Sequence, residues 1–353
     1  MTKDFIYKHV ETGKYFKWSS DDVDNLSDTD RYSWVQIITG PNMHLYKRML
    51  YKKEIVKIRK QKLKQINDMA NKIFVTASSG NIGRQIVQIL NSSNADFVAG
   101  ISQREEGKSF PYSTQVIDFA NKNAMSEIFK GFDTLFLLVP VHPFMIDLAK
   151  NAVDAAKIAG VKYIVRSSGF GANIQSEYKL SQIQGTIDEY IKASGLSFTI
   201  TEPNNFMQNF VNFHANDIKN GVMYMPTGSG KVSWIDVRDI ATVNAAILQN
   251  PLKYAGQTIE LTGSESLSYA DCLAIISEAI EKTVSFVDVP AQAAIDAMKQ
   301  YQMPDFIIEI MSSLNQLIKE GKAEHTSDSL NSITGLTPIL FKEFVQENKS
   351  YWI

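Results

Sequence analysis

The chain has 353 residues, 44% of them hydrophobic, so it can bury a large core in one or two domains. No apolar run approaches the ~20 residues that cross a membrane, and a single cysteine, Cys272, excludes an intramolecular disulfide. The formal net charge of −2 excludes no class of partner by itself. Because the N-terminus lacks the apolar core of a signal peptide and the histidines show no metal spacing, we expect a cytoplasmic protein without a metal or a membrane contact.

Residues 1–70 are expected to form an N-terminal extension of different composition from the rest. They hold 14 Lys and Arg against 9 Asp and Glu, and they are rich in aromatic residues, which disordered segments lack. Residues 5–18 are predicted to form a hairpin, 34–38 a short strand and 44–69 a long basic helix.

The basic helix has two interpretations. One is a solvated face on a helix that packs on the body or on a second subunit, which would make a homo-oligomer. The other is a surface for nucleic acid, but no nucleic-acid motif supports it. We therefore expect the extension to pack on its own subunit or on a neighbour and to carry no catalytic residue.

Residues 73–84 read IFVTASSGNIGR, which predicts a strand, a tight turn of small residues and the start of a helix. This is the context that a dinucleotide site requires. Backbone N–H groups and the dipole at the helix start bind a pyrophosphate, and small residues let it approach. The usual first glycine is Ala77 here, so the pattern is A-x-x-G-x-x-G. Cofactor contacts are expected from Thr76, Ser78, Ser79, Gly80, Asn81 and Ile82.

From residue 72, predicted strands and helices alternate. The strands are 73–76, 97–101, 114–117, 134–139, 162–166 and 197–201, and the helices 82–90, 123–129, 143–159 and 180–193. Such alternation is typical of parallel strands with crossover helices, so we predict an α/β fold with a doubly wound, Rossmann-type sheet over residues 71–353.

After Pro203 the alternation loosens. Residues 204–353 are predicted to build a smaller, mostly helical lobe over the carboxyl ends of the strands, where ligands bind in such folds. Its expected strands are 222–225, 231–234, 257–261 and 284–289, and its helices 239–248, 269–280, 291–299 and 305–319.

Several stretches occur in a family's order: VTASSGNIGRQIV, GFDTLFLLVPVHP, AGVKYIVRSSGFGA, ASGLSFTITEPNNFMQNF, SWIDVRDIATVNAAIL and SITGLTPILFKEFV. Together they resemble the NmrA-like branch of the atypical short-chain dehydrogenase/reductases, over about residues 72–349. The resemblance implies either a nicotinamide-dependent reductase of quinones, azo dyes or triphenylmethane dyes, or a cofactor-sensing regulator without turnover. It gives no role to residues 1–70.

The choice between NADP(H) and NAD(H) rests on the end of the second predicted strand. An acid there would bind the ribose 2′-hydroxyl of NAD, but the strand ends Gly100-Ile101-Ser102-Gln103-Arg104. Arg104 can pair with a 2′-phosphate, while many family members carry arginine where this chain has Gln103. Although Glu105 and Glu106 follow, NADP(H) is favoured. The resemblance further implies contacts to the adenine from Asp118 and Phe119, and to the ribose and nicotinamide from Leu138, Val139, Pro140, Ser167 and Ser168.

The Tyr-x-x-x-Lys pair of the better-known short-chain dehydrogenases is missing. Gln184 stands where relatives carry Lys or His, and Leu180 stands four residues before it. Glutamine is no general acid, but it can hydrogen-bond a carbonyl. Tyr178 lies nearby at the wrong spacing. Gln184 and Tyr178 are the candidate catalytic residues, and the missing pair fits either a reductase that takes its proton from solvent or a sensor.

The turn after the sixth strand is expected to face the substrate. Phe206 and Met207 would give apolar contact and Asn205 a polar anchor, although Phe206 and Met207 equally fit a core-filling role. The leading hypothesis is an NADPH-dependent reductase of a small conjugated acceptor of the quinone, azo-dye or imine type. The alternative is a non-catalytic NADP(H)-sensing protein that acts through a protein partner.

Overall fold

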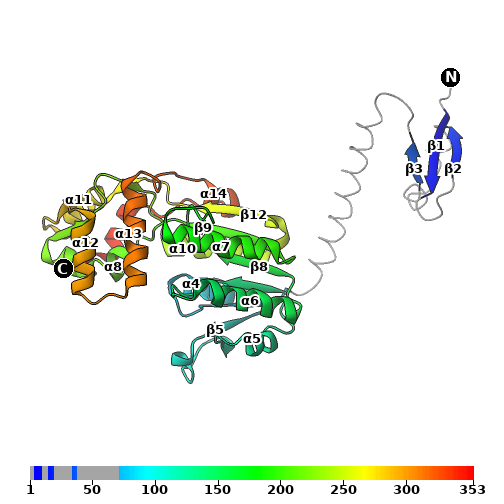
Figure 1. Ribbon diagram of the computed structural model, residues 1–353, viewed down its shortest axis with the longest axis horizontal. Helices are drawn as coiled ribbons and strands as arrows, with labels where there is room; N and C mark the ends of the chain where they lie inside the picture. Colours follow the sequence, from blue (N-terminus) through cyan, green and yellow to red (C-terminus); the bar gives the residue numbers. More distant parts are fainter. Residues whose placement is uncertain (1–3, 10–14, 20–33, 38–70) are drawn as a thin grey trace. The chain divides into compact units, whose positions relative to one another are not determined.

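The computed structural model describes residues 4–9, 15–19, 34–37 and 71–353, and the chain divides into two compact units, Met1–Met69 and Ala70–Ile353 (Figure 1). In the first unit, β1 (Asp4–His9) pairs antiparallel with β2 (Tyr15–Ser19) and with β3 (Trp34–Ile37). The predicted hairpin and third strand are therefore confirmed. The predicted helix at 44–69 lies outside the described residues, and the nature of its surface stays a prediction.

The second unit is built on a seven-stranded parallel sheet in the order β12-β9-β8-β7-β4-β5-β6. From β4 the chain continues to β5 and β6 on one side, and then crosses to β7 on the other. The order therefore reverses beside β4, which is where ligands bind in open α/β sheets. The strands are β4 (Ile73–Val75), β5 (Phe97–Ile101), β6 (Thr114–Val116), β7 (Thr134–Leu137), β8 (Tyr163–Ser167), β9 (Ser197–Pro203) and β12 (Gln257–Leu261).

Helices cover both faces of this sheet, and alternate side chains of each strand point to opposite faces. On one face Ile73 and Val75 pack against α4 (Asn81–Ser92), α10 (Val237–Gln249) and α14 (Ser329–Thr334). On the other face Phe74 packs with α5 (Lys122–Ile128), α6 (Met145–Ala159) and α7 (Lys179–Ala193). Burial on both sides explains the nearly continuous apolar runs of the strands. The predicted doubly wound fold is confirmed.

Three elements that follow Pro203, namely β12, α10 and α14, belong to the sheet rather than to the lobe. β12 pairs with β9, and α10 packs on α4. Sequence alternation missed this placement because the chain passes through the lobe between β9 and these elements. The lobe expected at 204–353 is thus interrupted by a return to the sheet at residues 237–261 and again at Ser329–Thr334.

The remaining C-terminal segments form a smaller, mostly helical lobe with its own core (Figure 1). β10 (Val222–Met225) pairs parallel with β14 (Ser285–Asp288), and β11 (Lys231–Val232) antiparallel with β13 (Leu267–Ser268). Its helices are α8 (Asn209–Asn212), α9 (Ala215–Asn220), α11 (Tyr269–Ile280), α12 (Ala291–Gln300), α13 (Asp305–Lys319) and α15 (Phe341–Asn348). Short 3₁₀ turns occur at η1 (Gln103–Glu105), η2 (Pro251–Tyr254) and η3 (Lys349–Tyr351).

Aromatic side chains fill the core of the C-terminal lobe. The ring of Phe210 lies 5.0 Å from those of Trp234 and Phe341, both in edge-on contact, and Trp352 donates its indole N–H to the carbonyl of Phe210 at 3.0 Å. Asn204, at the end of β9, fastens the lobe to the sheet through hydrogen bonds to Ser233 and to the carbonyl of Ala323. Within the described residues no helix combines the length and apolarity needed to span a membrane.

Candidate functional site

The turn between β4 and α4 is held by its own small side chains. Thr76 Oγ1 donates to the carbonyls of β7 and its following loop and accepts from Leu138 N at 2.9 Å, while Ser78 Oγ donates to the carbonyl of Gly100 at 2.7 Å. A Cβ on Gly83 would lie 2.1 Å from the carbonyl oxygen of Ala77, so only glycine allows the helix to pack this close. Thr76 and Ser78 are buried, and their hydroxyls are engaged with the neighbouring strands. Their side chains therefore stabilise the turn rather than face a ligand.

The first turn of α4 is open to an anion. No side chain caps the helix, and the backbone N–H groups of Asn81, Ile82 and Gly83 have no acceptor among the described residues. Ser79, Gly80 and Asn81 are exposed, and Ile82 is buried. Uncapped N–H groups at the positive end of a helix dipole suit a phosphate. The residues of this turn therefore fit the pyrophosphate of a dinucleotide.

The predicted adenine and 2′-phosphate contacts follow the next two strands of the sheet. Arg104 lies in η1 directly after β5; it is exposed and has no ion pair with a described residue. Gln103, also exposed, donates to Glu106. Asp118 and Phe119 follow β6, where exposed Asp118 accepts the N–H of Ala120 and Phe119 is half-buried.

The predicted ribose and nicotinamide residues follow β7 and end β8. Leu138 is half-buried, Val139 buried and Pro140 exposed, so this loop presents a partly apolar surface. Ser167 is fully buried and its Oγ has no hydrogen-bond partner in the described residues. A buried hydroxyl without a partner is costly unless a ligand or a water satisfies it. Because parallel strands share one carboxyl edge, β4, β5, β6, β7 and β8 bring all these residues to the same edge as the open helix.

Behind the end of β8 lies a buried polar network that the sequence reading did not anticipate. Arg166, fully buried, donates through Nη2 to Gln184 Oε1 at 2.5 Å and through Nη1 to the carbonyl of Ser167. Its Nε lies 3.8 Å from Asp188 Oδ1, while Ser168 Oγ donates to the other carboxylate oxygen. Burial raises the pKa of Asp188, and the charge of Arg166 opposes that rise.

A signal for this network was present in the sequence. Arg166 interrupts the apolar strand that reads YIVRS, and Asp188 faces the same strand from α7. A charged residue inside a buried strand requires a partner, so Arg166 predicts a facing acid.

The two candidate catalytic residues are separated in the structure. Gln184 is buried against the end of β8, where a Cβ on Gly169 would lie 3.5 Å from its Cγ. Tyr178 instead belongs to the core of the C-terminal lobe, and its hydroxyl donates to Glu320. That hydrogen bond, followed by burial, raises the pKa of Tyr178 to about 12. The hydroxyl of Tyr178 is thus already engaged with Glu320, away from Gln184.

The three predicted substrate residues have different environments. Met207 is buried in the core of the C-terminal lobe, and Phe206 is half-buried against the sheet core. Asn205 is half-buried, and its amide donates to Asn204 Oδ1 at 3.2 Å. A backbone bridge from Phe206 to Ile235 fixes this turn beside β9. For Met207 the core-filling role is evident, whereas Asn205 and Phe206 keep exposed atoms.

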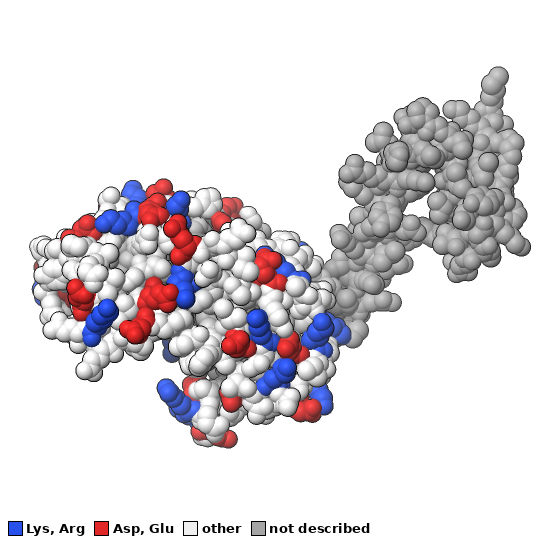
Figure 2. All heavy atoms as spheres, in the orientation of Figure 1, with Lys and Arg blue, Asp and Glu red and all other residues white. Residues whose placement is uncertain are grey.

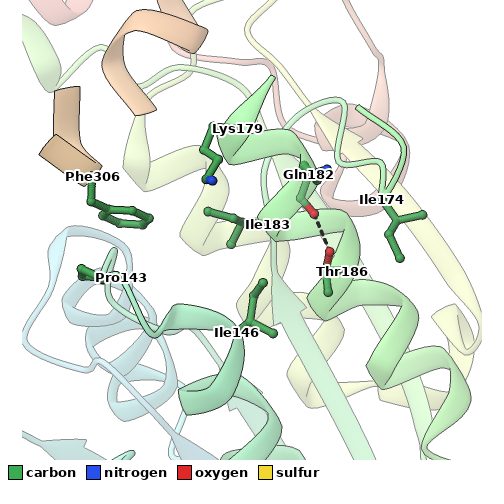
Figure 3. Close-up of a pocket in the computed structure, with 8 residues that line it drawn as sticks. All are labelled: Pro143, Ile146, Ile174, Lys179, Gln182, Ile183, Thr186 and Phe306. Carbon is green, nitrogen blue, oxygen red and sulfur yellow. Dashed lines mark hydrogen bonds between the residues drawn. The ribbon is translucent and has the colours of Figure 1, made fainter. Parts of the chain in front are cut away.

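A separate surface cavity of about 320 Å³ lies on the outer face of α7 (Figure 3). The side chains of Lys179, Ile183 and Phe306 converge on it from α7 and α13. Gln182 and Thr186 continue this face of α7, whereas Gln184 projects from the other side of the helix toward β8. None of the site residues predicted from the sequence lines this cavity.

The visible surface shows both signs of charge. On the face drawn in Figure 2, acidic and basic side chains of the described residues are interspersed. A nucleic-acid footprint would instead gather one sign in a patch or stripe.

The chain is similar in sequence and in fold to known proteins. The chain is 30% identical to the NAD(P)H azoreductase of Xenophilus azovorans over 277 residues, which are 78% of this chain and 96% of that protein. It is 19% identical to a solved NADPH-dependent quinone oxidoreductase of Escherichia coli in complex with NADPH, with a TM-score of 0.72, covering 78% of this chain and 99% of that one.

The comparison also reaches a protein of another kind. A solved structure of NmrA, a negative transcriptional regulator, in complex with NAD is 17% identical, with a TM-score of 0.66, covering 79% of this chain and 95% of that one. At these identities the two structural likenesses show the fold alone. The expected class, NAD(P)H-dependent oxidoreductase, is that of the azoreductase relative. The model of the NmrA-like family matches residues 69–339, and with it the chain is established as a member of the NmrA-like family.

Proposed function

We propose that this protein is an NADPH-dependent reductase of a small conjugated acceptor of the quinone, azo-dye or imine type. The observation that carries the proposal is a neutral amide, Gln184, held at the carboxyl end of β8, on the same sheet edge as the uncapped start of α4. The azoreductase relative and the quinone oxidoreductase fold support the choice of reaction.

The cofactor, when bound, supplies the hydride, and this chain's residues bind and orient it. The backbone of Ser79, Gly80, Asn81 and Ile82 would hold the pyrophosphate, and the loop after β7 would cover the nicotinamide with apolar surface. Ser167, the last residue of β8, is proposed to lie beside the ribose. The side chains of Thr76 and Ser78 keep this edge in place through the neighbouring strands.

The acceptor class follows from the absence of an acid at position 184. An amide cannot deliver a proton, so the acceptor must either need none or take one from solvent. Conjugated acceptors meet this condition because their π system spreads the incoming electron pair. Such a reaction depends chiefly on holding the reactive atom against the nicotinamide. Asn205 and Phe206, at the end of β9, are proposed to contact the acceptor.

The preference for NADPH is proposed to come from Arg104. This exposed residue has no carboxylate partner among the described residues and directly follows β5. Replacing Arg104→Gln should weaken NADPH binding about tenfold, the loss of one charge-assisted hydrogen bond, and leave NADH binding unchanged. The control is Lys108→Gln in the same loop. It removes the same charge from a side chain that already has a carboxylate partner, Glu105, at 4.0 Å. Equal loss of affinity for both cofactors would contradict this role.

The rival function is a cofactor-sensing regulator without turnover. It gains support from the same neutral Gln184, from the engaged hydroxyl of Tyr178 and from the fold shared with NmrA. The deciding experiment is the loss of NADPH absorbance with a panel of quinones, azo dyes and iminium compounds, beside a titration of cofactor binding. Turnover with any acceptor supports the reductase. Tight NADPH binding without turnover on the whole panel would replace it with the regulator.

A further inference from the structure

The buried network at the end of β8 gives Gln184 a defined orientation. Arg166 Nη2 donates to Gln184 Oε1 at 2.5 Å, and a guanidinium has no acceptor atom to offer the other side of the amide. The amide nitrogen Nε2 must therefore point away from Arg166. It makes no hydrogen bond to a described residue and lies 3.8 Å from the position that a Cβ on Gly169 would occupy.

Arg166 is itself held on several sides. Nη1 donates to the carbonyl of Ser167 and, at 3.4 Å, to that of Leu137 on the neighbouring strand. The Asp188 carboxylate lies 3.8 Å from Nε and accepts the hydroxyl of Ser168. Nη1 is thus taken up by two carbonyls, and Nη2 donates to Gln184. The fork geometry of arginine makes this set of contacts, and the single ammonium of lysine could not.

We propose that Arg166 is a positioning residue that fixes Gln184 as a hydrogen-bond donor to the acceptor oxygen or nitrogen on which negative charge develops. This inference rests on the proposed function. It specifies that Gln184 donates a hydrogen bond, whereas an amide side chain can either donate or accept one. In the reaction NADPH becomes NADP⁺ as its hydride moves to the acceptor, and water supplies the proton. The N–H of Gln184 stabilises the developing charge without transferring a proton.

The test compares Gln184→Glu, Gln184→Ala and the matched control Gln182→Glu. Glu at 184 keeps the bond to Arg166 but replaces the donating nitrogen with an accepting oxygen. Gln182→Glu makes the same chemical change at an exposed position on the outer face of α7, beside the cavity in Figure 3. With a benzoquinone as acceptor, both variants at 184 should lower kcat by ~10-fold or more with the Kd for NADPH little changed. Gln182→Glu should match the parent protein.

Arg166→Lys and the double variant Arg166→Lys/Gln184→Ala test the positioning role. Lysine keeps the charge beside Asp188, so kcat should fall in Arg166→Lys but not fall further in the double variant than in Gln184→Ala. If Arg166 only stabilised the fold, Arg166→Lys would lower kcat by the same factor in the parent protein and in Gln184→Ala. If Arg166→Lys does not fold, kcat of Gln184→Glu against the parent still decides, because Glu keeps the bond to Arg166 and loses only the donor that Arg166 is proposed to orient.

The outcomes separate this inference from the function on which it rests. Failure of the parent protein to reduce any acceptor of the panel overturns the reductase and this inference together. Normal turnover of the parent and of Gln184→Glu overturns only the inference, because the amide nitrogen would then be dispensable. Additive losses for Arg166→Lys and Gln184→Ala overturn the positioning role of Arg166.

Discussion

At the scale of single residues, Ala77 departs from a relaxed backbone, as one of four non-glycine residues with positive φ in the described part of the chain. It has a φ of 50°, in the left-handed region that disfavours any residue with a Cβ. It occupies the position of the first glycine in the dinucleotide pattern, so the turn requires this conformation whichever residue is present. The strain is therefore imposed by the turn between β4 and α4.

Replacing Ala77→Gly should stabilise the protein by about 1 kcal/mol, since relief of the left-handed strain outweighs the entropy that glycine loses on folding. Denaturant unfolding measures the change. Ala293→Gly in α12, an exposed helical position, is the control and should destabilise by about 1 kcal/mol. A loss of stability in Ala77→Gly as large as in the control would show that the turn carries no such strain.

Glu202, near the end of β9, is a buried carboxyl whose protonation is linked to folding. Burial first, and then the negative charges of Asp188 and Glu260, raise its pKa from 4.5 to about 7. Between those values the folded protein holds a proton that the unfolded chain has released. The free energy of unfolding therefore falls as pH rises from 4.5 to 7 and is level above it, as far as Glu202 is concerned.

Replacing Glu202→Gln should remove this dependence. At pH values above 7 the variant should be more stable than the parent by about 2 kcal/mol, and below 4.5 the two should converge. Asp239, whose pKa is raised to about 6 mainly by burial, titrates in the same window, so only the difference between variant and parent reports Glu202. A difference that does not change with pH would contradict the assignment.

Residue patterns identify candidate residues of the site more readily than the contacts that hold them in place. Gln184 was found because it stands at a position where relatives carry an ionisable residue. The amide's orientation depends on Arg166, which lies 18 positions away in the sequence, and nothing local links the two. Similarly, the sequence identified Tyr178 as a candidate, but its hydrogen bond to Glu320 joins residues 142 positions apart.

At the scale of elements, the turn from β4 to α4 makes different demands on its two glycines. A Cβ on Gly80 would meet only the carbonyl oxygen of Ala77, at 3.3 Å, whereas a Cβ on Gly83 would lie 2.1 Å from the same atom. The open space at Gly80 is where the pyrophosphate is proposed to bind. At Gly83 the absence of a side chain is what lets α4 pack closely against the turn.

Replacing Gly80→Leu should abolish NADPH binding in a folded protein, because its side chain would occupy the space of the phosphate. Gly83→Ala should instead destabilise the fold by at least about 2 kcal/mol, since backbone must move to admit the methyl group. Calorimetric titration with NADPH and thermal unfolding of both variants separate the two effects. Unchanged NADPH affinity in folded Gly80→Leu would remove the turn from the cofactor site.

Most elements of the sheet were predictable because their periodicity is local. The strand at 97–101 was predicted with its observed bounds, and α4 extends its prediction of 82–90 only slightly. The seventh strand was recognised at 257–261 but not assigned to the sheet, because its pairing with β9 joins residues about 60 positions apart. Pairing between residues far apart in the sequence leaves no periodic pattern in the strand itself. The pattern therefore predicts where this strand begins and ends, but not its position in the sheet.

At the scale of the whole molecule, the sheet unit is complete without the extension. Its first strand begins at Ile73, and every pairing of the seven-stranded sheet lies within residues 73–261. Asn71 belongs to that unit, since its side chain donates to the carbonyl of Leu248 at 2.7 Å and accepts the hydroxyl of Thr134 at 2.7 Å. Through Asn71 the start of β4 is tied to α10 and β7.

A truncation that begins at Asn71 should therefore keep the NADPH affinity of the full chain, while losing stability or changing oligomeric mass if the extension packs as predicted. One that begins at Ile73 should be less stable still, because it lacks the bonds of Asn71 and the N–H that Lys72 donates to Asp133. NADPH titration, thermal unfolding and light scattering on the full chain and both truncations measure these effects. If the chain from Asn71 folded, kept its mass and lost NADPH binding, the extension would contribute to the cofactor site, and the domain division at residue 70 would not separate the functional unit.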